Sequence, residues 1–348
     1  MKASVLTEYR RVEWQEVETP KIDDSQVLVK VSYASICGSD QHIFNGEFHP
    51  RTKTPLIMGH EFGGTIVEVG RRVSGYKAGD RVAVDPIYWC AQCPACRLKH
   101  YPACSSLKLL GIDSNGGFGQ YVAVKDFMLY RLGENISDRH AAMIELLSIG
   151  FHACNRAGIK KDDTVLIAGA GRVGQCILQA ARTITDNTIY MVDILANRLA
   201  LAEKTWPNVV GINAAEHDPV GVIKELTKGR GVDAAFEAVG HARLIENRLS
   251  PVCLCIEAIR GAGTVCVLGL GDEPVSLVMK RLIWKEARIV ASRVTHGEFK
   301  ETIAHLAHGH LKPDALISCE MPASQAQEAF ELLESQPQDY LKILLAIP

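Results

Sequence analysis

The sequence predicts an α/β protein made of two parts, a β-rich part and a doubly wound parallel sheet. Short runs of alternating apolar and polar residues fill the chain up to about residue 130. Buried strands alternate with helical stretches from Lys161 onward, and a glycine motif follows the first of those strands. The length of 348 residues suits two domains, since a domain commonly takes ~150 residues.

The β-rich part is predicted from period-two patterns. Residues 26–34 (QVLVKVSYA) alternate apolar and polar side chains, and similar runs recur at 64–69 and 81–84. Gly, Pro and Asp separate these runs, as expected for turns between strands. We therefore expect strands across most of this part.

The second part is predicted from strands that alternate with helices, which is the pattern of βαβ units feeding a parallel sheet. Its predicted strands span 164–168, 188–192, 209–212, 233–236, 264–268 and 288–292. Beyond them, 297–311 and 323–335 have the periodicity of amphipathic helices, and 340–347 (YLKILLAI) is typical of a closing strand. We expect this tail to return to the first part.

Charge and hydropathy exclude several classes of protein. The 38 basic and 40 acidic side chains give a net charge of −2 without a long run of one sign, so we expect no nucleic-acid partner. The longest apolar stretch, Ala141–Cys154, contains Glu145 and His152 and is shorter than the ~20 residues that span a bilayer. The first residues lack the apolar core of a signal peptide. We expect a cytoplasmic protein with no membrane partner.

A dinucleotide-binding motif is the most specific signal in the second part. The run Gly169-Ala170-Gly171-Arg172-Val173-Gly174 follows a predicted strand, and Asp193 ends the next strand, 24 residues after Gly169. Glycines let the backbone approach a pyrophosphate, the helix amino terminus offers N–H donors, and the carboxylate can accept the ribose hydroxyls. A tight turn without a ligand is the alternative. Asp193 repels a 2′-phosphate and Arg198 can stack on adenine or neutralise a phosphate, so the pattern favours NAD over NADP.

The eleven cysteines indicate metal or redox use over disulfides. A loop rich in turn residues holds four of them at the spacing C-x2-C-x2-C-x7-C: Cys90, Cys93, Cys96 and Cys104. Four thiolates at this spacing complete a closed tetrahedral zinc site, which is structural because it leaves no position for a substrate. An iron–sulfur cluster and free thiols are the alternatives.

A second, dispersed set has the ligand types of a catalytic zinc. Cys37 lies in ICGSDQH, His60 and Glu61 lie in GHEFGG, and Glu145 lies in AAMIELLSIGFH. Thiolate, imidazole and carboxylate suit zinc, and a site with three protein ligands keeps a fourth position open for a substrate. The remaining cysteines are interpreted as core residues: Cys154, Cys176, Cys253, Cys255, Cys266 and Cys319.

Together these motifs resemble the zinc-dependent medium-chain alcohol dehydrogenase family, and more closely its polyol branch of sorbitol, threonine and sugar-acid dehydrogenases. The resemblance extends over nearly the whole chain. It implies a GroES-like β-rich catalytic domain at 1–155 and 290–348, with a structural zinc lobe at about 88–106, and a Rossmann NAD-binding domain at 156–289. It also implies one catalytic and one structural zinc ion per chain.

The resemblance gives roles to the candidate metal ligands. Cys37, His60 and Glu61 match the family's catalytic zinc positions. Glu145 falls where the polyol branch carries a carboxylate. Whether Glu61 or Glu145 binds zinc directly or through water stays open at this point.

The resemblance also implies cofactor and substrate positions. The run Leu268-Gly269-Leu270 matches the segment that passes the nicotinamide carboxamide, and Arg293 matches an arginine near the polyol substrate. Ser39 and His42 match a relay that carries the substrate proton to solvent.

The implied reaction is hydride transfer from a secondary hydroxyl of a polyol, sugar acid or similar small alcohol to NAD, with zinc as Lewis acid. A threonine or vicinal-diol dehydrogenase is the enzymatic alternative, and a catalytically inactive nucleotide-binding relative is the alternative of another class. The family pairs the edges of its Rossmann sheets, which implies a homo-dimer or homo-tetramer, and the apolar run 267–279 can contribute to that interface.

Overall fold

The computed structural model describes residues 1–240 and 249–348. Its contacts divide the chain into two compact units: unit 1 comprises Met1–Leu146 and Thr295–Pro348, and unit 2 comprises Leu147–Val294. The divisions expected from the sequence are at 155/156 and 289/290. Helix α4 (Ile144–Ala157) begins in unit 1 and continues in unit 2.

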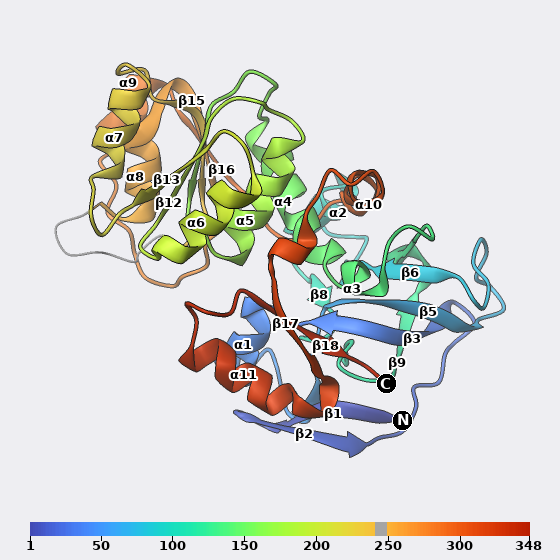
Figure 1. Ribbon diagram of the computed structural model, residues 1–348. Helices are drawn as coiled ribbons and strands as arrows, with labels where there is room; N and C mark the ends of the chain where they lie inside the picture. The colour runs from blue at the N-terminus through green and yellow to red at the C-terminus, as the bar shows by residue number, and fades with distance from the viewer. Residues whose placement is uncertain (241–248) are drawn as a thin grey trace. The chain divides into compact units, whose positions relative to one another are not determined.

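Unit 1 is built on a seven-stranded sheet with the order β10-β6-β5-β3-β18-β17, in which β9 also pairs with β3 (Figure 1). The predicted alternation at 26–34 becomes β3, whose Val27, Val29 and Val31 are buried while Lys30 is exposed. A three-stranded sheet, β2-β1-β4, and the short pair β7-β8 complete the strands. Most of the first part is therefore β structure, as predicted.

The elements of unit 1 from the amino-terminal segment are β1 (Lys2–Glu8), β2 (Arg11–Glu16), β3 (Gln26–Ser35), α1 (Gly38–Phe44), β4 (Leu56–Ile57), β5 (Glu61–Val69), β6 (Arg81–Val84), β7 (Ile87–Tyr88), α2 (Pro94–Arg97), β8 (Lys108–Leu109), β9 (Tyr121–Lys125), β10 (Leu129–Arg131) and α3 (Asp138–Ala141). Those from the carboxyl-terminal segment are α10 (Phe299–Ala307), β17 (Ile317–Pro322), α11 (Ala326–Ser335) and β18 (Lys342–Ala346).

The carboxyl-terminal tail completes the sheet of the amino-terminal segment. The predicted closing strand is β18, which pairs antiparallel with β3 and parallel with β17. The two predicted amphipathic helices are α10 and α11, which bury Phe299 and Phe330. Because β18 lies against β3, its first residue, Lys342, is brought close to the segment that follows β3.

Unit 2 is a six-stranded parallel sheet with the order β13-β12-β11-β14-β15-β16 (Figure 1). Counted from the first strand of the unit, this order is 3-2-1-4-5-6, the doubly wound order of dinucleotide-binding folds. The elements are β11 (Val165–Ala168), α5 (Arg172–Arg182), β12 (Ile189–Asp193), α6 (Ala196–Thr205), β13 (Val209–Asn213), α7 (Pro219–Leu226), β14 (Val232–Glu237), α8 (Pro251–Ala258), β15 (Ile259–Val267), α9 (Met279–Lys285) and β16 (Arg288–Ala291). The predicted fold class is confirmed.

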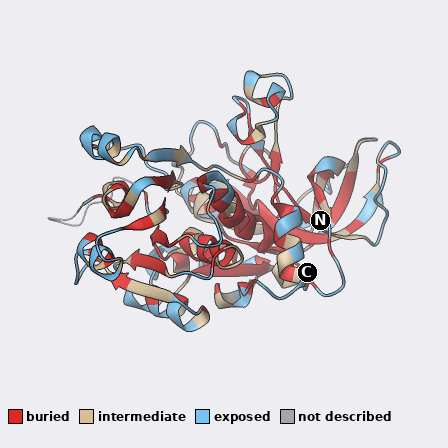
Figure 2. Cartoon of the chain, turned by 90° about the horizontal axis from the view of Figure 1, so that it is seen from above, coloured by how far each residue is buried: buried red, intermediate tan, exposed pale blue. Residues whose placement is uncertain are grey.

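The strands of unit 2 carry its core. Strand β11 is buried throughout, and Figure 2 marks the buried residues in red. Strand β15 starts at Ile259, earlier than the predicted 264. Its early part contains Gly261-Ala262-Gly263, with Ala262 at φ 57°, and the pairing register with β14 is irregular there. A Gly-Ala-Gly run is typical of a turn, so the sequence pattern did not indicate a strand there.

None of the helices among the described residues is long and apolar enough to cross a membrane.

Candidate active site

The dispersed metal ligands come together in unit 1. Cys37 precedes α1, and His60 and Glu61 lie at the start of β5. The register of β3 with β5 places Ser35 opposite Glu61, which brings the two ends of these strands together. One ligand atom from each of Cys37, His60 and Glu61 lies within 4.8 Å of the others. We call these three residues the ligand group.

A buried carboxylate contacts two members of the ligand group. Asp40, in the first turn of α1, accepts a hydrogen bond of 2.8 Å from the Cys37 amide through Oδ2. Its Oδ1 lies 3.3 Å from His60 Nδ1, and both side chains are buried. A carboxylate on one imidazole nitrogen directs the other nitrogen, here Nε2, toward a metal.

Glu61 is held by a buried cation. Its Oε2 accepts hydrogen bonds from Lys342 Nζ and Ser35 Oγ, and Lys342 also donates to the Ile36 carbonyl at 3.1 Å. Glu61 and Lys342 have no exposed surface. The other carboxylate oxygen of Glu61, Oε1, is buried and has no hydrogen-bond partner in the described part of the chain. One oxygen is therefore neutralised within the protein, and the second remains able to accept a further ligand.

Glu145 adds a second buried carboxylate near the ligand group. It lies in the first turn of α4 and is 5% exposed. Burial, together with the negative charge of Glu61, raises the pKa of Glu145 to about 8. Lys342 brings one positive charge to a site that holds a thiol, an imidazole and two buried carboxylates. A divalent cation would balance the remaining negative charge of the ligands. The residues therefore fit a zinc ion.

Ser39 and His42 occupy different environments on α1. The Ser39 hydroxyl lies 3.4 Å from both Cys37 Sγ and His60 Nε2, at the ligand group itself. His42 is exposed, with Nδ1 2.5 Å from Glu47 Oε2 and its ring stacked on Phe48. The predicted relay would thus run from a partly buried hydroxyl to an imidazole in contact with solvent.

The four cysteines of the predicted lobe form the second group of potential ligands, with their sulfur atoms within 4.8 Å of one another. Sγ of Cys90 lies 3.6 Å from that of Cys104 and 4.0 Å from that of Cys96. Backbone N–H groups point at the sulfurs, which lowers the pKa of Cys93 to about 6. Four convergent sulfurs with N–H support fit a closed zinc site.

The glycine motif has the geometry that a pyrophosphate site requires. Gly169 adopts φ +104°, and Gly171 is the N-cap of α5. A Cβ on Gly174 would lie 1.8 Å from the Gly169 carbonyl oxygen, so only glycine allows this close approach. Asp193 at the end of β12 accepts a hydrogen bond of 2.7 Å from the Ala170 amide. The acidic residue and the glycine loop are therefore adjacent, as predicted from their spacing.

Two guanidinium groups lie beside this loop. A Cβ on Gly171 would lie 3.6 Å from Arg198 Nη1. Burial lowers the pKa of Arg198; the negative charge of Asp193 opposes this shift, and the positive charge of Arg172 adds to it. Arg172 Nη1 is buried without a hydrogen-bond partner among residues 1–240 and 249–348. Arg172 in the first turn of α5 and Arg198 on α6 carry like charges, which favour an anion between them.

The remaining predicted cofactor and substrate residues follow β15 and β16. The amides of Leu268 and Gly269 donate to the Glu237 carbonyl at 2.9 and 3.1 Å, which fixes this segment beside the end of β14. Leu270 is 79% exposed, and Arg293 is exposed. All of these residues belong to unit 2.

Comparison with protein families gives two matches in chain order. Residues 23–134 match the alcohol dehydrogenase GroES-like domain, and residues 173–308 match the zinc-binding dehydrogenase domain. The D-arabitol-phosphate dehydrogenase of Enterococcus avium is 32% identical, over 95% of this chain and 96% of its own length. The chain belongs to the zinc-dependent medium-chain alcohol dehydrogenase family.

Further relatives support this family assignment. The sorbitol dehydrogenase of Bacillus subtilis is 30% identical to this dehydrogenase, over 99% of this chain and 97% of its own length. The structure of the rspB dehydrogenase of Escherichia coli CFT073 in complex with NADH is similar, with a TM-score of 0.90 at 28% identity. The match covers 100% of this chain and 99% of that chain. These similarities place the dehydrogenase in the polyol branch of the family.

Three residues of the sites were missed by sequence reasoning: Asp40, Lys342 and Arg172. Asp40 is one of many acidic residues in the sequence. Lys342 gave a usable signal, because a lysine inside the apolar strand YLKILLAI requires a buried partner. Arg172 occupies a variable position of the glycine motif, where its side chain cannot be interpreted without the position of α6.

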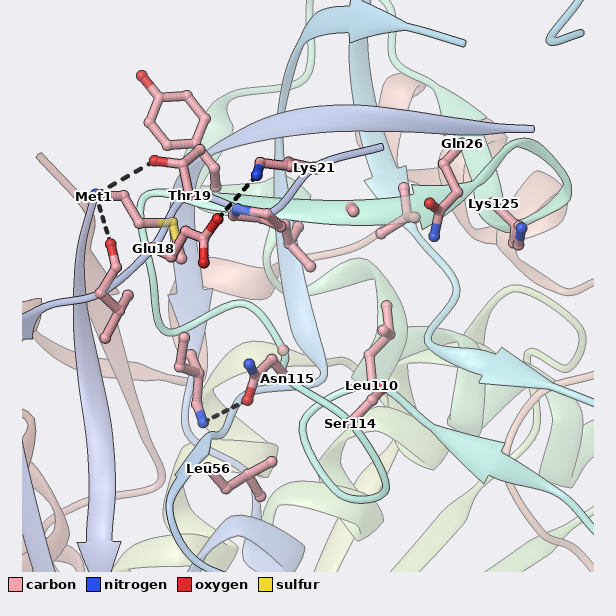
Figure 3. A pocket seen from close by; sticks show the side chains of 18 of the residues that line it. Met1, Glu18, Thr19, Lys21, Gln26, Leu56, Leu110, Ser114, Asn115 and Lys125 are labelled. Atoms are coloured by element: carbon pink, nitrogen blue, oxygen red, sulfur yellow. Dashed lines mark hydrogen bonds and ion pairs between the residues drawn. The ribbon is translucent and has the colours of Figure 1, made fainter. Parts of the chain in front are cut away.

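Unit 1 of the dehydrogenase also contains a cavity of about 1010 Å³ (Figure 3). The Met1 amino group donates to Thr19 at 3.3 Å, and Glu18 pairs with Lys21 at 3.3 Å on its wall. None of its described lining residues is a member of the ligand group or one of the four lobe cysteines. The sequence gave no indication of this cavity.

Proposed function

We propose that this dehydrogenase oxidises a secondary hydroxyl of a polyol, a polyol phosphate or a sugar acid, with NAD as hydride acceptor. The observation that carries the proposal is the buried ligand group of Cys37, His60 and Glu61, with Glu145 beside it. A thiolate, an imidazole and a carboxylate leave an open position on zinc for a substrate. The names of the relatives in the polyol branch support this class of substrate.

Bound zinc supplies a Lewis acid toward a substrate hydroxyl, and bound NAD accepts the hydride. The protein's own residues orient the ligands and move the proton. Asp40 fixes the tautomer and direction of His60. Ser39 is placed to take the hydroxyl proton, and His42, three residues further on α1, passes it to solvent.

A substrate panel tests the proposal. NADH formation is measured with zinc-loaded protein on polyols, their phosphate esters, sugar acids, vicinal diols and threonine. We expect turnover in one of the first three groups. Preference for threonine or a vicinal diol would replace the proposed substrate class. Absence of turnover on every compound, with NAD or NADP and with zinc bound, would favour the inactive nucleotide-binding relative.

The preference for NAD is proposed to depend on Asp193. Its carboxylate lies at the glycine loop, where the 2′-phosphate of NADP would meet its negative charge. Asp193→Ser is expected to lower the ratio of kcat/KM for NAD over NADP by at least ~10-fold, since it removes that repulsion. The exposed Asp186→Ser variant is the matched control, and an unchanged ratio in Asp193→Ser would contradict the assignment.

We propose that the dehydrogenase is a homo-oligomer that associates through β16 and α9. Strand β16 pairs only with β15 in the described sheet, so its other edge is open. Ile283 and Trp284 of α9 are each 69% exposed, and Ile289 of β16 is 42% exposed. An open strand edge beside exposed apolar side chains is typical of a surface covered by another chain.

Charge substitution at this edge tests the association. Ile283→Glu combined with Ile289→Lys is expected to convert the oligomer to a monomer in light scattering with size exclusion. Leu226→Glu on α7 is the control, because Leu226 is also an exposed apolar residue, at 53%. An unchanged mass for the double variant would exclude this edge as the interface.

A cytoplasmic location is part of the proposal. No disulfide links the eleven cysteines, all of which lie in the described residues, and four of them form a group that fits zinc. An oxidising compartment would favour disulfide formation among those four thiols.

A further inference from the structure

A second, small cavity in unit 1 has an unusual lining. Its volume is about 140 Å³. Four of its lining side chains are aromatic rings, and one is a buried acid. It is lined by Asp85, Ile87, Trp89, Tyr101, Phe127, Met128, Tyr130, Thr295, His296 and Gly297.

The aromatic rings form a connected wall. Trp89 stacks on Tyr101 with ring centroids 4.2 Å apart, and Phe127 lies tilted by 56° against Trp89 at 5.1 Å. Tyr130 is fixed by stacking on Phe299 at 4.9 Å. Phe127 is 50% exposed, so the wall reaches the surface. The faces of such rings carry negative electrostatic potential and attract cations.

The acid in this lining is Asp85, which directly follows β6. It is 7% exposed, and its polar contacts are long: the Ile87 amide at 3.4 Å and the Thr295 hydroxyl at 3.2 Å. Within residues 1–240 and 249–348, no basic side chain forms an ion pair with Asp85. A buried carboxylate without a counter-ion is costly, so this position requires a proton or a cation.

The charges around Asp85 increase this requirement. Glu298, also 7% exposed, adds a second negative charge nearby. Burial is the main cause that raises the pKa of Asp85 to about 7, and Glu298 raises it further. Burial and Asp85 likewise raise the pKa of Tyr130 to about 12, so this phenol stays neutral. Tyr101 and His296 are the remaining titratable groups of the lining, and the exposed His296 packs edge-on against Tyr101.

We propose that this pocket, with Asp85 and the rings of Trp89, Phe127 and Tyr130, binds a small alkylammonium ion. The positive charge neutralises the buried carboxylate, and the alkyl groups pack on the ring faces. A neutral ligand leaves the carboxylate without a counter-charge. The volume restricts the ligand as well, since pockets for drug-sized molecules measure ~300–1000 Å³. The lining contains no residue of the ligand group and none of the four lobe cysteines, although Trp89 and Tyr101 belong to the lobe segment. The proposal does not depend on the proposed reaction.

Titration with tetramethylammonium chloride tests the pocket. Zinc-loaded protein is titrated in a calorimeter at constant ionic strength, and the change in tryptophan fluorescence, to which Trp89 contributes with three other tryptophans, is recorded. We expect saturable binding and a change in fluorescence. The neutral isostere tert-butanol and sodium chloride are expected to give neither. Equal binding of tert-butanol, or no saturable binding of tetramethylammonium, would overturn the proposal.

Two variants locate the binding. Asp85→Asn is expected to weaken tetramethylammonium binding at least ~10-fold, because it removes the buried charge. Phe127→Leu is expected to weaken it ~3-fold through loss of one ring face. Asp272→Asn, which removes an exposed carboxylate in unit 2, is the matched control and is expected to bind as the wild type.

Zinc content and thermal unfolding establish that each variant is folded. If Asp85→Asn does not fold, the binding measured with Phe127→Leu, a substitution at an exposed residue, tests the location of the site. Binding that is unchanged in the folded variants would show that tetramethylammonium binds elsewhere, which overturns the assignment.

Discussion

His60→Ala is expected to reduce alcohol-dependent NADH formation by about 1000-fold or more, because the metal contributes several kcal/mol to the transition state. His60 supplies the imidazole of the ligand group, and its Nδ1 lies 3.3 Å from Asp40 Oδ1. The same variant is expected to lose one of two zinc ions, since the cysteine lobe lies outside the substitution. Metal analysis and initial rates on the same preparation measure both effects.

His217→Ala is the control for His60→Ala, because the His217 side chain is 61% exposed and lies in unit 2. It is expected to keep both zinc ions and wild-type turnover. Wild-type turnover in His60→Ala with only one zinc ion remaining would contradict the role of the ligand group.

Lys342→Met is expected to destabilise the protein strongly. It leaves the Glu61 carboxylate buried without its cation, and removal of one partner from a buried pair costs ~3–5 kcal/mol. For a domain of the size of unit 1, this corresponds to a fall in Tm of roughly 10 °C. Thermal unfolding of the zinc-loaded protein measures the effect.

A double-variant cycle separates the ion pair from packing. Glu61→Gln together with Lys342→Met removes both charges, and we expect it to recover part of the stability lost in Lys342→Met. The exposed Lys30→Met on β3 is the control for loss of a lysine and should shift Tm little. Additive losses in the double variant would mean that the pair is not coupled.

The fold was largely predictable because its signals are local. The period-two run that becomes β3 and the βαβ pattern of unit 2 each depend on neighbouring residues. The beginning of β15 was not predicted, because Gly261-Ala262-Gly263 interrupts the apolar pattern and is read as a turn. The apolar character of Val265 and Cys266 marked only the buried end of that strand.

The residue types of the metal ligands were also predictable, but the residues that contact and hold those ligands were not. Cys37 and His60 stand in glycine-flanked contexts that point to a metal. Lys342 reaches Glu61 only because β18 pairs with β3, across 281 residues of sequence. Contacts of this kind depend on strand order, which a single sequence does not specify. The aromatic pocket around Asp85 escaped prediction for the same reason, since Thr295 and Asp85 are 210 residues apart.

The most direct test of the account is turnover before and after removal of the zinc ion at the ligand group. NADH formation on the best polyol substrate is followed in the native protein, after mild chelation that leaves the cysteine lobe loaded, and after zinc is restored. We predict that activity falls with the loss of this zinc ion and returns with it. Full activity in protein that lacks this zinc ion would contradict a zinc-dependent dehydrogenase built on Cys37, His60 and Glu61.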